Sequence, residues 1–307
     1  MRRAGRVAEP DFSVVVPAHN AERTIGAAVA ALLAQDPPPR EVIVVDDDST
    51  DATAAIAAAA GARVLPQSVR GYAGGARNRG WQAAGGDVVV FVDSDVVVAD
   101  DWSVGLARAL TEFPGAVVGC ARRFSARTPW GWVAHLQVET PYLQRGNPRD
   151  VPFLSSFCLA VPRDAPLRWD ESYGGEDGLF SARALAAGLR LVFDPRFYAF
   201  HDHTRETFHE LRRQQMRMAY GFARCGPVHR EGLHKRLLSR VPLHYFVLAR
   251  LPIIYRRVRH DAELRRHFLR LLPRLVIAEW TYGFSALRYV IRRPSVGTPT
   301  DAPHFSA

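Results

Sequence analysis

The sequence has few cysteines, almost no lysine and no long uncharged apolar run. Its three cysteines, Cys120, Cys158 and Cys225, are far apart in a chain of 307 residues. They match neither a disulfide framework nor a paired zinc spacing, so we expect free thiols in a reducing compartment. Lysine occurs once, at Lys235, among 40 basic residues. The preference for arginine accompanies Ala-rich runs and is consistent with codon bias, so no function is inferred from it.

Membrane-spanning, secreted and disordered classes have little support in the sequence. No run of 18 residues is free of charge, which argues against a simple transmembrane helix. The first ten residues contain Arg2, Arg3 and Arg6 but no apolar core of a signal peptide. A hydrophobic content of 48% with 23% charged residues excludes wholesale disorder. We therefore expect a folded cytoplasmic protein.

The net charge of +9 is unevenly distributed along the chain. Residues 204–307 carry 20 Lys and Arg against 7 Asp and Glu, whereas residues 1–203 carry 20 against 24. This contrast predicts an acidic domain at 1–203 and a basic helical extension at 204–307. The end of the extension, 293–307, is rich in Pro, Ser and Thr and is expected to be frayed.

Short apolar runs alternate with helical segments through the acidic part. Strands are predicted at 12–17, 41–45, 63–65, 87–92, 116–123, 153–161 and 189–193, of which the first two are expected to be buried. Helices are predicted at 22–35, 50–60, 76–84, 102–113 and 181–187, with a flexible loop at 71–75. This alternation favours an α/β fold with a mostly parallel central sheet flanked by helices.

Acidic residues follow two of the predicted strands at their carboxyl ends. Three Asp residues occupy 46–48, and Asp93 and Asp95 follow the run 87–92. Ligands of parallel sheets bind beyond the carboxyl ends of the strands, and paired carboxylates suit Mg²⁺ or Mn²⁺. A solvated turn or a helix cap would also explain one or two of these acids. Both interpretations are open for each cluster taken alone.

Three further segments have a functional and a structural interpretation. The segment 70–80 combines glycines with three arginines, which suits either a phosphate-binding loop or a basic surface loop. Glu176 and Asp177 precede a predicted helix, where acids can stabilise the helix dipole or act as a base. His201 and His203 offer imidazole ligands, although most single histidines bind no metal.

The ordered set of motifs resembles inverting glycosyltransferases of family 2. In chain order the motifs are SVVVPAHN at 13–20, VVDDDSTD at 44–51, GGARNRG at 74–80, DSD at 93–95, GED at 175–177 and the late His201. Each motif is common, but the set in this order is highly specific. The resemblance covers 12–203 and implies a single GT-A domain, the α/β fold that binds nucleotide sugars.

The resemblance also implies how a donor nucleotide would be held. Pro17 and Asn20 would line the nucleotide pocket. Asp47 would meet the base, supported by Asp46, and Arg77 would lie near the base or the diphosphate. One departure is the third Asp of 46–48, where the family often has a small residue or Gly.

The remaining motif residues would serve the metal and the reaction. The resemblance implies that Asp95 ligates Mn²⁺ or Mg²⁺, that Asp93 contacts the ribose or the metal, and that His201 contacts the metal or the diphosphate. His203 is an alternative to His201. Asp177 would be the general base, with Glu176 orienting it or the acceptor.

The implied activity is metal-dependent, inverting transfer of a sugar from a nucleoside diphosphate to an acceptor hydroxyl or phosphate. A lipid-linked or polysaccharide acceptor of the cell envelope, used at the inner face of the membrane, is favoured. The alternatives are a soluble transferase acting on a small molecule or protein, and a non-catalytic sugar-nucleotide-binding protein. A nucleotidyltransferase is disfavoured, because Pro17-Ala18-His19-Asn20 replaces the Gly- and Arg-rich loop expected after the first strand.

The basic extension has the pattern of surface helices. A helix is predicted at 204–230, and apolar segments follow at 241–255 and 271–291. In the last segment four arginines, 270, 274, 288 and 292, share one side, and the apolar positions 272, 275, 276, 282, 286 and 290 share the other. This pattern predicts contact with an anionic membrane surface.

A second interpretation of the extension remains open. Glu279 falls within the apolar side, where a membrane would penalise its charge, so packing on the catalytic domain or a second subunit is the alternative. No nucleic-acid-binding motif is present, so nucleic acid is not an expected partner.

Overall fold

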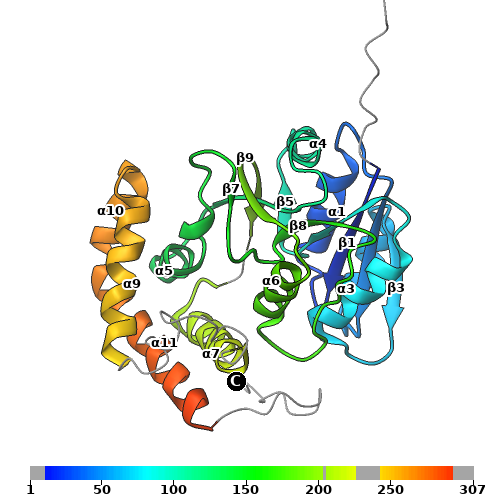
Figure 1. Ribbon diagram of the computed structural model, residues 1–307. Coiled ribbons are helices and arrows are strands. Elements are labelled where there is room, and N and C mark those ends of the chain that lie inside the picture. The colour runs from blue at the N-terminus through cyan, green and yellow to red at the C-terminus, as the bar shows by residue number, and fades with distance from the viewer. Residues whose placement is uncertain (1–10, 203–204, 226–242, 293–307) are drawn as a thin grey trace, which may run out of the picture.

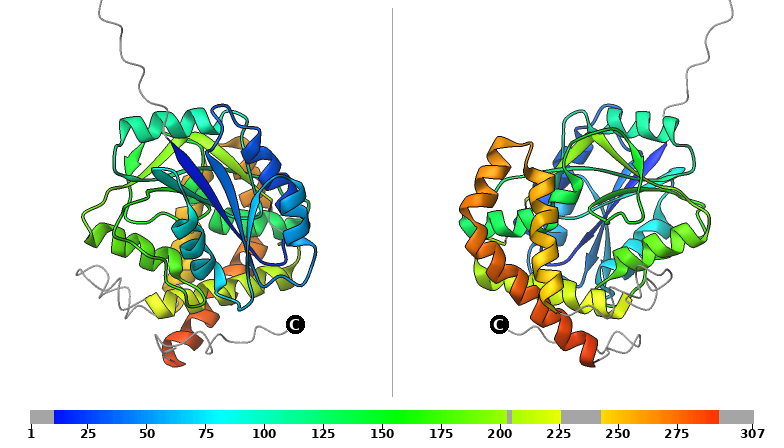
Figure 2. Two further views of the ribbon diagram at one scale, coloured as in Figure 1. Left: turned by 90° about the vertical axis from the view of Figure 1, so that its right-hand side faces the viewer. Right: turned by 60° about the vertical axis from the view of Figure 1, so that its left-hand side comes forward.

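The computed structural model describes residues 11–202, 205–225 and 243–292 (Figure 1). The predicted tail at 293–307 and His203 therefore lie outside the described residues. The described chain forms one mixed β-sheet with helices on both faces and a group of further helices beyond one edge (Figures 1 and 2).

The sheet has the order β3-β2-β1-β4-β8-β6-β9-β5, with β7 paired to β9. The strands are β1 Phe12–Ala18, β2 Glu41–Asp47, β3 Arg63–Gln67, β4 Val88–Val92, β5 Val96–Val98, β6 Val117–Phe124, β7 Arg149–Asp150, β8 Cys158–Pro162 and β9 Leu191–His201. β3, β2, β1 and β4 run parallel. β8 is antiparallel to both β4 and β6, whereas β6 and β9 pair in parallel. The predicted mostly parallel sheet is therefore confirmed for its first half.

Two hydrophobic clusters fill the space between the sheet and its helices. Along β1, Val14 and Val16 contribute to one cluster and Val15 to the other, because successive side chains of a strand point to opposite faces. The first face is covered by α1 Ile25–Leu33, α2 Thr53–Ala59 and α4 Trp102–Glu112. The second is covered by α3 Tyr72–Ala83 and α6 Glu176–Ala186. Burial on both faces explains why the strands are continuous Val-rich runs.

A third cluster joins the C-terminal helices to the rest of the molecule. It contains buried side chains from α5 Pro129–Val138, α7 Phe208–Cys225, α9 Leu243–Val258, α10 Ala262–Arg270 and α11 Leu272–Arg292. These helices lie side by side beyond the sheet (Figure 2). No helix in 11–202, 205–225 or 243–292 is long and apolar enough to cross a membrane.

The face of α11 predicted to meet a membrane is partly turned towards the protein. Leu275 is fully buried in the third cluster, and Glu279 is only 1% exposed. The carboxylate of Glu279 accepts a hydrogen bond from Gln137 Nε2 at 2.8 Å and lies 3.3 Å from Arg250 NH1. At Leu275 and Glu279 the structure agrees with the alternative that the sequence left open, packing against the protein, because Glu279 has an internal cation and amide as partners.

Several predicted element boundaries are also wrong. The predicted loop at 71–75 is the first turn of α3, which begins at Tyr72. α6 begins at Glu176 instead of 181, and β9 extends to His201 instead of ending at 193. The predicted strand at 153–161 begins only at Cys158. The helix α5 and the short β5 were not predicted. Tertiary packing sets these boundaries against local propensity.

Candidate active site

The fold gathers most of the predicted site residues at one edge of the sheet. Asp46 and Asp47 are the last residues of β2, and the segment after β4 carries Asp93 and Asp95. His201 is the last residue of β9. β9 reaches Asp95 because it pairs antiparallel with β5, placing His201 opposite Val96. The α6 N-terminus adds Glu176 and Asp177.

Arg77 is a buried cation at the centre of this edge. It comes from α3 and is 3% exposed. Its NH2 donates to Asp93 Oδ1 at 2.8 Å and to Ser156 Oγ at 2.6 Å, and its NH1 lies 3.5 Å from Glu176 Oε1. Its guanidinium also lies over the Trp169 ring, 4.7 Å from the ring centre. Arg77 therefore ties the segment after β4 to the N-terminus of α6.

Asp177 is the carboxyl group with the most strongly disfavoured charge in this network. Burial raises the pKa of Asp177, the neighbouring Glu176 charge raises it further, and Arg77 only partly opposes them, giving a pKa of about 7. Its Oδ1 is buried and has no hydrogen-bond partner among the described residues. The group can therefore exchange a proton near neutral pH and has an oxygen available for a ligand.

Asp95, His201 and Glu139 form a second charged network beside the first. His201 Nε2 lies 3.4 Å from Asp95 Oδ2, and His201 Nδ1 lies 3.0 Å from Glu139 Oε1. Although burial opposes both charges, their attraction lowers the pKa of Asp95 to about 2 and raises the pKa of His201 to about 9. The other oxygen of Glu139 accepts a hydrogen bond from Arg122 at 2.6 Å.

This second network fits a divalent cation in its chemistry. Among the described residues, no three His, Cys, Asp or Glu side chains are already arranged as a metal cluster. However, Asp95 presents a carboxylate beside the His201 Nε2 atom, where a cation would take the place of the Nε2 proton, and Glu139 holds the other ring nitrogen. A buried carboxylate behind a histidine is the usual outer-shell support of a metal-binding imidazole. Carboxylate and imidazole together suit Mn²⁺ better than Ca²⁺.

The predicted nucleotide residues lie along the ends of β1 and β2. Asp47 Oδ1 accepts hydrogen bonds from Gln67 Nε2 at 2.8 Å and from the Gly71 backbone N–H at 2.6 Å. Asp46 is buried, and its Oδ1 has no partner among the described residues. Asn20 has a φ of 50° and accepts from the Thr50 backbone N–H at 2.9 Å.

Two of these placements qualify what the sequence suggested. Pro17 is buried within β1, opposite Val45 of β2, so it shapes the strand end rather than forming an exposed wall. Asp48, the departure from the family pattern, has a φ of 60°. Gly is the residue best suited to that conformation and Asp is one of the next best, which accounts for both the family preference and this exception.

Sequence reasoning missed four residues of the two networks. They are Arg122, Glu139, Ser156 and Trp169. A usable signal existed for Glu139, because it is a charged residue directly after the largely apolar segment 129–138, and such charges are normally paired. Arg122 gave a weaker signal, because it is one of two consecutive arginines at the end of the predicted strand 116–123. No sequence pattern distinguishes Ser156 or Trp169, since both reach the site from loops.

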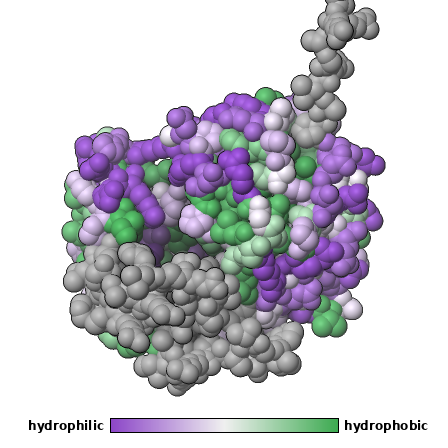
Figure 3. All heavy atoms as spheres, viewed as in Figure 1, coloured by the Kyte–Doolittle hydropathy of each residue, from purple (hydrophilic) through white to green (hydrophobic). Residues whose placement is uncertain are grey.

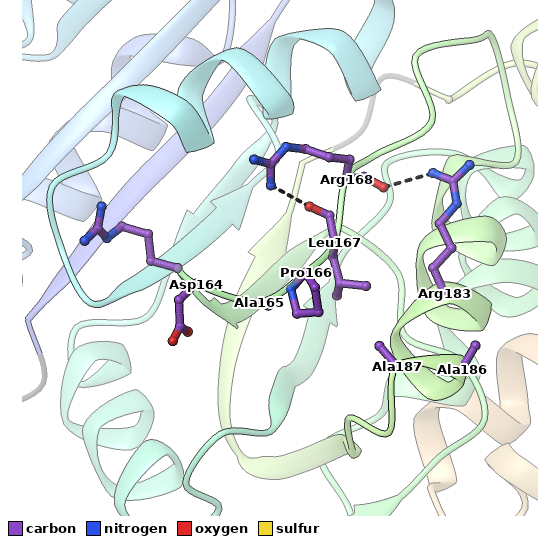
Figure 4. A pocket seen from close by; sticks show the side chains of 9 residues that line it. Asp164, Ala165, Pro166, Leu167, Arg168, Arg183, Ala186 and Ala187 are labelled. Atoms are coloured by element: carbon purple, nitrogen blue, oxygen red, sulfur yellow. Dashed lines mark hydrogen bonds between the residues drawn. The ribbon is translucent and has the colours of Figure 1, made fainter.

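A separate groove lies at the opposite end of α6 and does not belong to the candidate site. It has a volume of about 910 Å³ and is lined by 163–168 and the end of α6 (Figure 4). Arg168 NH1 donates to the Leu167 carbonyl, and Arg183 NH1 donates to the Arg168 carbonyl. Arg183 also lies 3.4 Å from Asp170. The contacts of Arg183 hold the loop to the helix, which is a structural role.

Solved structures with the same fold share this overall arrangement. A mannosyltransferase from Pyrobaculum calidifontis in complex with GDP-Man and Mn²⁺ has a TM-score of 0.59 at 20% identity, over 93% of this chain and 88% of that one. S. aureus TarS 1-349 in complex with UDP-GlcNAc has a TM-score of 0.52 at 20% identity, over 91% and 92%. GalNAc-T7 with UDP, GalNAc and Mn²⁺ has a TM-score of 0.56 at 17% identity, over 86% and 55%. These similarities show the GT-A fold.

The sequence itself identifies the family. No curated protein sequence gives a significant match. The model of the family described as "Glycosyl transferase family 2" matches residues 13–166, half of the chain, and ends before α6. The matched part includes the ends of β1 and β2, Arg77, Asp93 and Asp95. The chain therefore belongs to glycosyl transferase family 2 and has its GT-A fold.

Proposed function

We propose that this protein transfers a sugar from a nucleoside diphosphate to an acceptor hydroxyl or phosphate, with inversion at the anomeric carbon and with Asp177 as general base. The observation that carries the proposal is the state of Asp177. Its pKa of about 7 suits proton transfer near neutral pH, and its buried Oδ1 has no partner among the described residues. A carboxylate that only stabilised the helix dipole would not have a raised pKa, because a helix N-terminus favours the charged form.

With Asp177 as the one general base, the reaction is a single displacement at the anomeric carbon of the sugar. Asp177 removes the proton of the acceptor hydroxyl as its oxygen forms a bond to the anomeric carbon. The bond from that carbon to the diphosphate breaks on the opposite face, and the electron pair leaves with the diphosphate. Attack opposite the leaving group inverts the centre. Arg77 holds Glu176 and Asp93, which come from different elements, next to one another.

A divalent cation, Mn²⁺ or Mg²⁺, belongs to this proposal. Asp95 and His201 would hold it, with Asp93 as a further ligand or a ribose contact. When bound, the cation would offset the negative charge that develops on the leaving diphosphate. Support comes from the donor set described above and from the Mn²⁺ in the related mannosyltransferase and GalNAc-T7 structures.

The donor is proposed to bind along the ends of β1 and β2. Asp47 and Asp46 would contact the base and Asn20 would line its pocket. The related structures bind GDP-Man and UDP-GlcNAc, so a purine and a pyrimidine nucleotide are both in scope. The acceptor is proposed to be lipid-linked or a polysaccharide of the cell envelope, used at the inner face of the membrane. The basic charge of the C-terminal helices supports this location.

A melting-temperature panel tests the donor and metal assignments. UDP, GDP, dTDP and CMP are each added with Mn²⁺ and with EDTA. A ligand at 100 times its dissociation constant adds about 2.7 kcal/mol, a shift of a few degrees for a domain of this size. We expect one diphosphate to stabilise the protein only with metal, and Asp95→Ala to remove that shift. Asp100→Ala, an exposed acid outside the site, is the matched control. No shift with any nucleotide would contradict the proposal.

The base and the stereochemistry need separate measurements. Asp177→Asn is expected to lower kcat by about 10²- to 10⁴-fold while the nucleotide-induced melting shift remains. NMR coupling constants of the product's anomeric proton report whether the configuration is inverted. Retention of configuration, or full activity of Asp177→Asn, would remove the assigned mechanism.

A further inference from the structure

The outward side of α11 carries an apolar stripe that nothing in the described chain covers. Its members are large side chains spaced by three to five residues. They are Leu272, 38% exposed, Ile277, 48%, Trp280, 42%, Phe284, 57%, and Leu287, 42%. The buried residues Leu275 and Ala278 lie on the opposite side and face the third cluster. We refer to the five exposed residues as the α11 stripe.

Polar groups next to the stripe already satisfy their own hydrogen bonds. Thr281 Oγ1 donates to the Ile277 carbonyl at 2.9 Å, and Ser285 Oγ donates to the Thr281 carbonyl at 2.8 Å. Hydroxyls bonded to the backbone of their own helix can enter an apolar environment at little cost. The stripe and its polar neighbours are therefore both compatible with removal from water.

The surroundings of the stripe are cationic. Arg274 and Arg288 are exposed on α11, about 40° apart around the helix, at one border of the stripe. α10 adds exposed Arg265, Arg266 and Arg270 directly before it. Between 264 and 292 the sequence has one acidic residue, Glu279, which is buried and paired. The stretch 264–292 therefore offers apolar area and positive charge without an exposed carboxylate, and the exposed acid nearest to it in the sequence is Glu263, at the start of α10.

We infer that the α11 stripe docks in the plane of an anionic lipid surface, with the apolar side chains below the headgroups and the arginines at the phosphates. An amphipathic helix with aromatic residues and bordering cations binds in this way. A two-fold dimer through the same face is disfavoured, because it would bring the arginines of α11 together with no exposed acid on α11 to pair with them. The purpose of this contact, access to a lipid-linked acceptor, rests on the proposed function, whereas the contact itself does not.

The α11 stripe is not the side of the helix that the sequence pattern predicts to meet a membrane. The sequence pattern placed Leu275 and Tyr282 on the membrane side, but Leu275 is fully buried and the guanidinium of Arg250 lies over the Tyr282 ring, 4.8 Å from its centre. The part of α9 and α10 that is visible in Figure 3 is mainly hydrophilic, and their exposed large apolar side chains among the described residues are Ile253, Tyr255 and Leu269. The contact is therefore assigned to the outward side of α11 alone.

Co-sedimentation of the full chain with vesicles tests the inference. The vesicles are pure phosphatidylcholine, or phosphatidylcholine with phosphatidylglycerol at about 30%. We expect binding to the anionic vesicles, weakened by added salt. Trp280→Ser with Phe284→Ser should lower the partition coefficient by about tenfold or more. Arg274→Gln with Arg288→Gln should lower it about thirtyfold on anionic vesicles and leave binding to neutral vesicles unchanged.

Matched controls use exposed residues that lie outside α11. Val69→Ser with Val104→Ser replaces apolar side chains that are exposed elsewhere, and Arg40→Gln removes an exposed arginine. All three substitutions should leave vesicle binding unchanged, and circular dichroism confirms that each variant is folded. The nucleotide-induced melting shift should persist in every α11 variant, so a failed docking surface and a failed transferase give different results.

Three results would overturn the inference. The first is no binding of the wild-type chain to anionic vesicles at low salt. The second is equal binding of the wild type and the Trp280/Phe284 variant. The third is a wild-type dimer, measured by light scattering, that the Trp280/Phe284 variant converts to a monomer while vesicle binding is absent. That last result would assign the stripe to a second copy of the chain.

Discussion

Replacing Glu176 by Gln should move the pH dependence of the reaction to lower pH without removing the base. The Glu176 charge is the second-largest cause of the raised pKa of Asp177, after burial. Glu176 also lies 3.5 Å from Arg77, so its removal leaves more of the Arg77 charge to stabilise an ionised Asp177. Both effects favour the charged carboxylate.

The expected size of the shift follows from these contacts. A charge in close contact moves a carboxyl pKa by about one to three units, and we take about one unit for a partly exposed pair. With a pKa of about 7, roughly a tenth of Asp177 is ionised at about pH 6, and with a pKa of about 6 this becomes roughly half. Activity at that pH, relative to its own high-pH plateau, should therefore rise about fivefold.

The assay is kcat/KM between about pH 5 and about pH 9, measured as release of nucleoside diphosphate. The midpoint of the acid limb is the readout, because Glu176→Gln can also lower the plateau through the acceptor. Glu263→Gln, an exposed acid on α10, is the control and should leave the midpoint unchanged. An unmoved midpoint in Glu176→Gln, or one moved to higher pH, would refute the assignment of the limb to Asp177.

The pH dependence of the melting temperature gives a second measurement of the Asp177 pKa. Three further tests concern the packing and the network of Asp95, His201 and Glu139. A carboxyl whose folded-state pKa is raised contributes stability that is present below the unfolded-state pKa and is lost as pH rises through the folded-state pKa. Compared with Asp177→Asn, the wild-type melting temperature should therefore fall between about pH 4 and about pH 7, and parallel curves would contradict the raised pKa. Gly80→Ala would bring a Cβ into overlap with a methyl group of Val15 and should lower the free energy of unfolding by about 1–3 kcal/mol. Gly75→Ala lies in the same helix but has open space around it, so it should raise the free energy of unfolding by about 0.5–1 kcal/mol. Denaturant melts measure both changes. Glu139→Gln should weaken Mn²⁺ binding about 10- to 100-fold in calorimetry, and unchanged affinity would separate it from the metal site. Glu279→Ala should destabilise the fold by about 1–3 kcal/mol, because Arg250 loses its internal partner, and an unchanged melting temperature would count against this pairing.

Local sequence patterns were sufficient for the first half of the fold. The Val-rich runs that became β1, β2 and β4 are buried on both faces, so their apolar continuity identifies them without tertiary information. The boundaries of α3 and α6 were less predictable. Glycines at 71–75 suggested a loop, but α3 begins at Tyr72, since packing outweighs the low helix propensity of Gly.

The sequence could also predict which acids cluster, but not what surrounds them. The carboxyl ends of parallel strands meet at one edge, so Asp47 and Asp93 were expected to lie near each other. The raised pKa of Asp177 was not predictable, because it depends on burial and on a balance between Glu176 and Arg77 that come from different helices. The support of His201 by Glu139 was likewise invisible, since the two residues are 62 positions apart.

By itself, the sequence determined the family, the first parallel strands and the acidic edge, because these depend on ordered motifs and on the two-residue period of strands. Only the tertiary structure decided which face of α11 is covered, because a helical pattern shows that a helix has an apolar side but not which neighbours will cover it. In this chain Gln137 of α5 donates a hydrogen bond to Glu279, and Arg250 of α9 forms an ion pair with it. The side of α11 that carries Glu279 therefore faces the protein, and the α11 stripe faces outward.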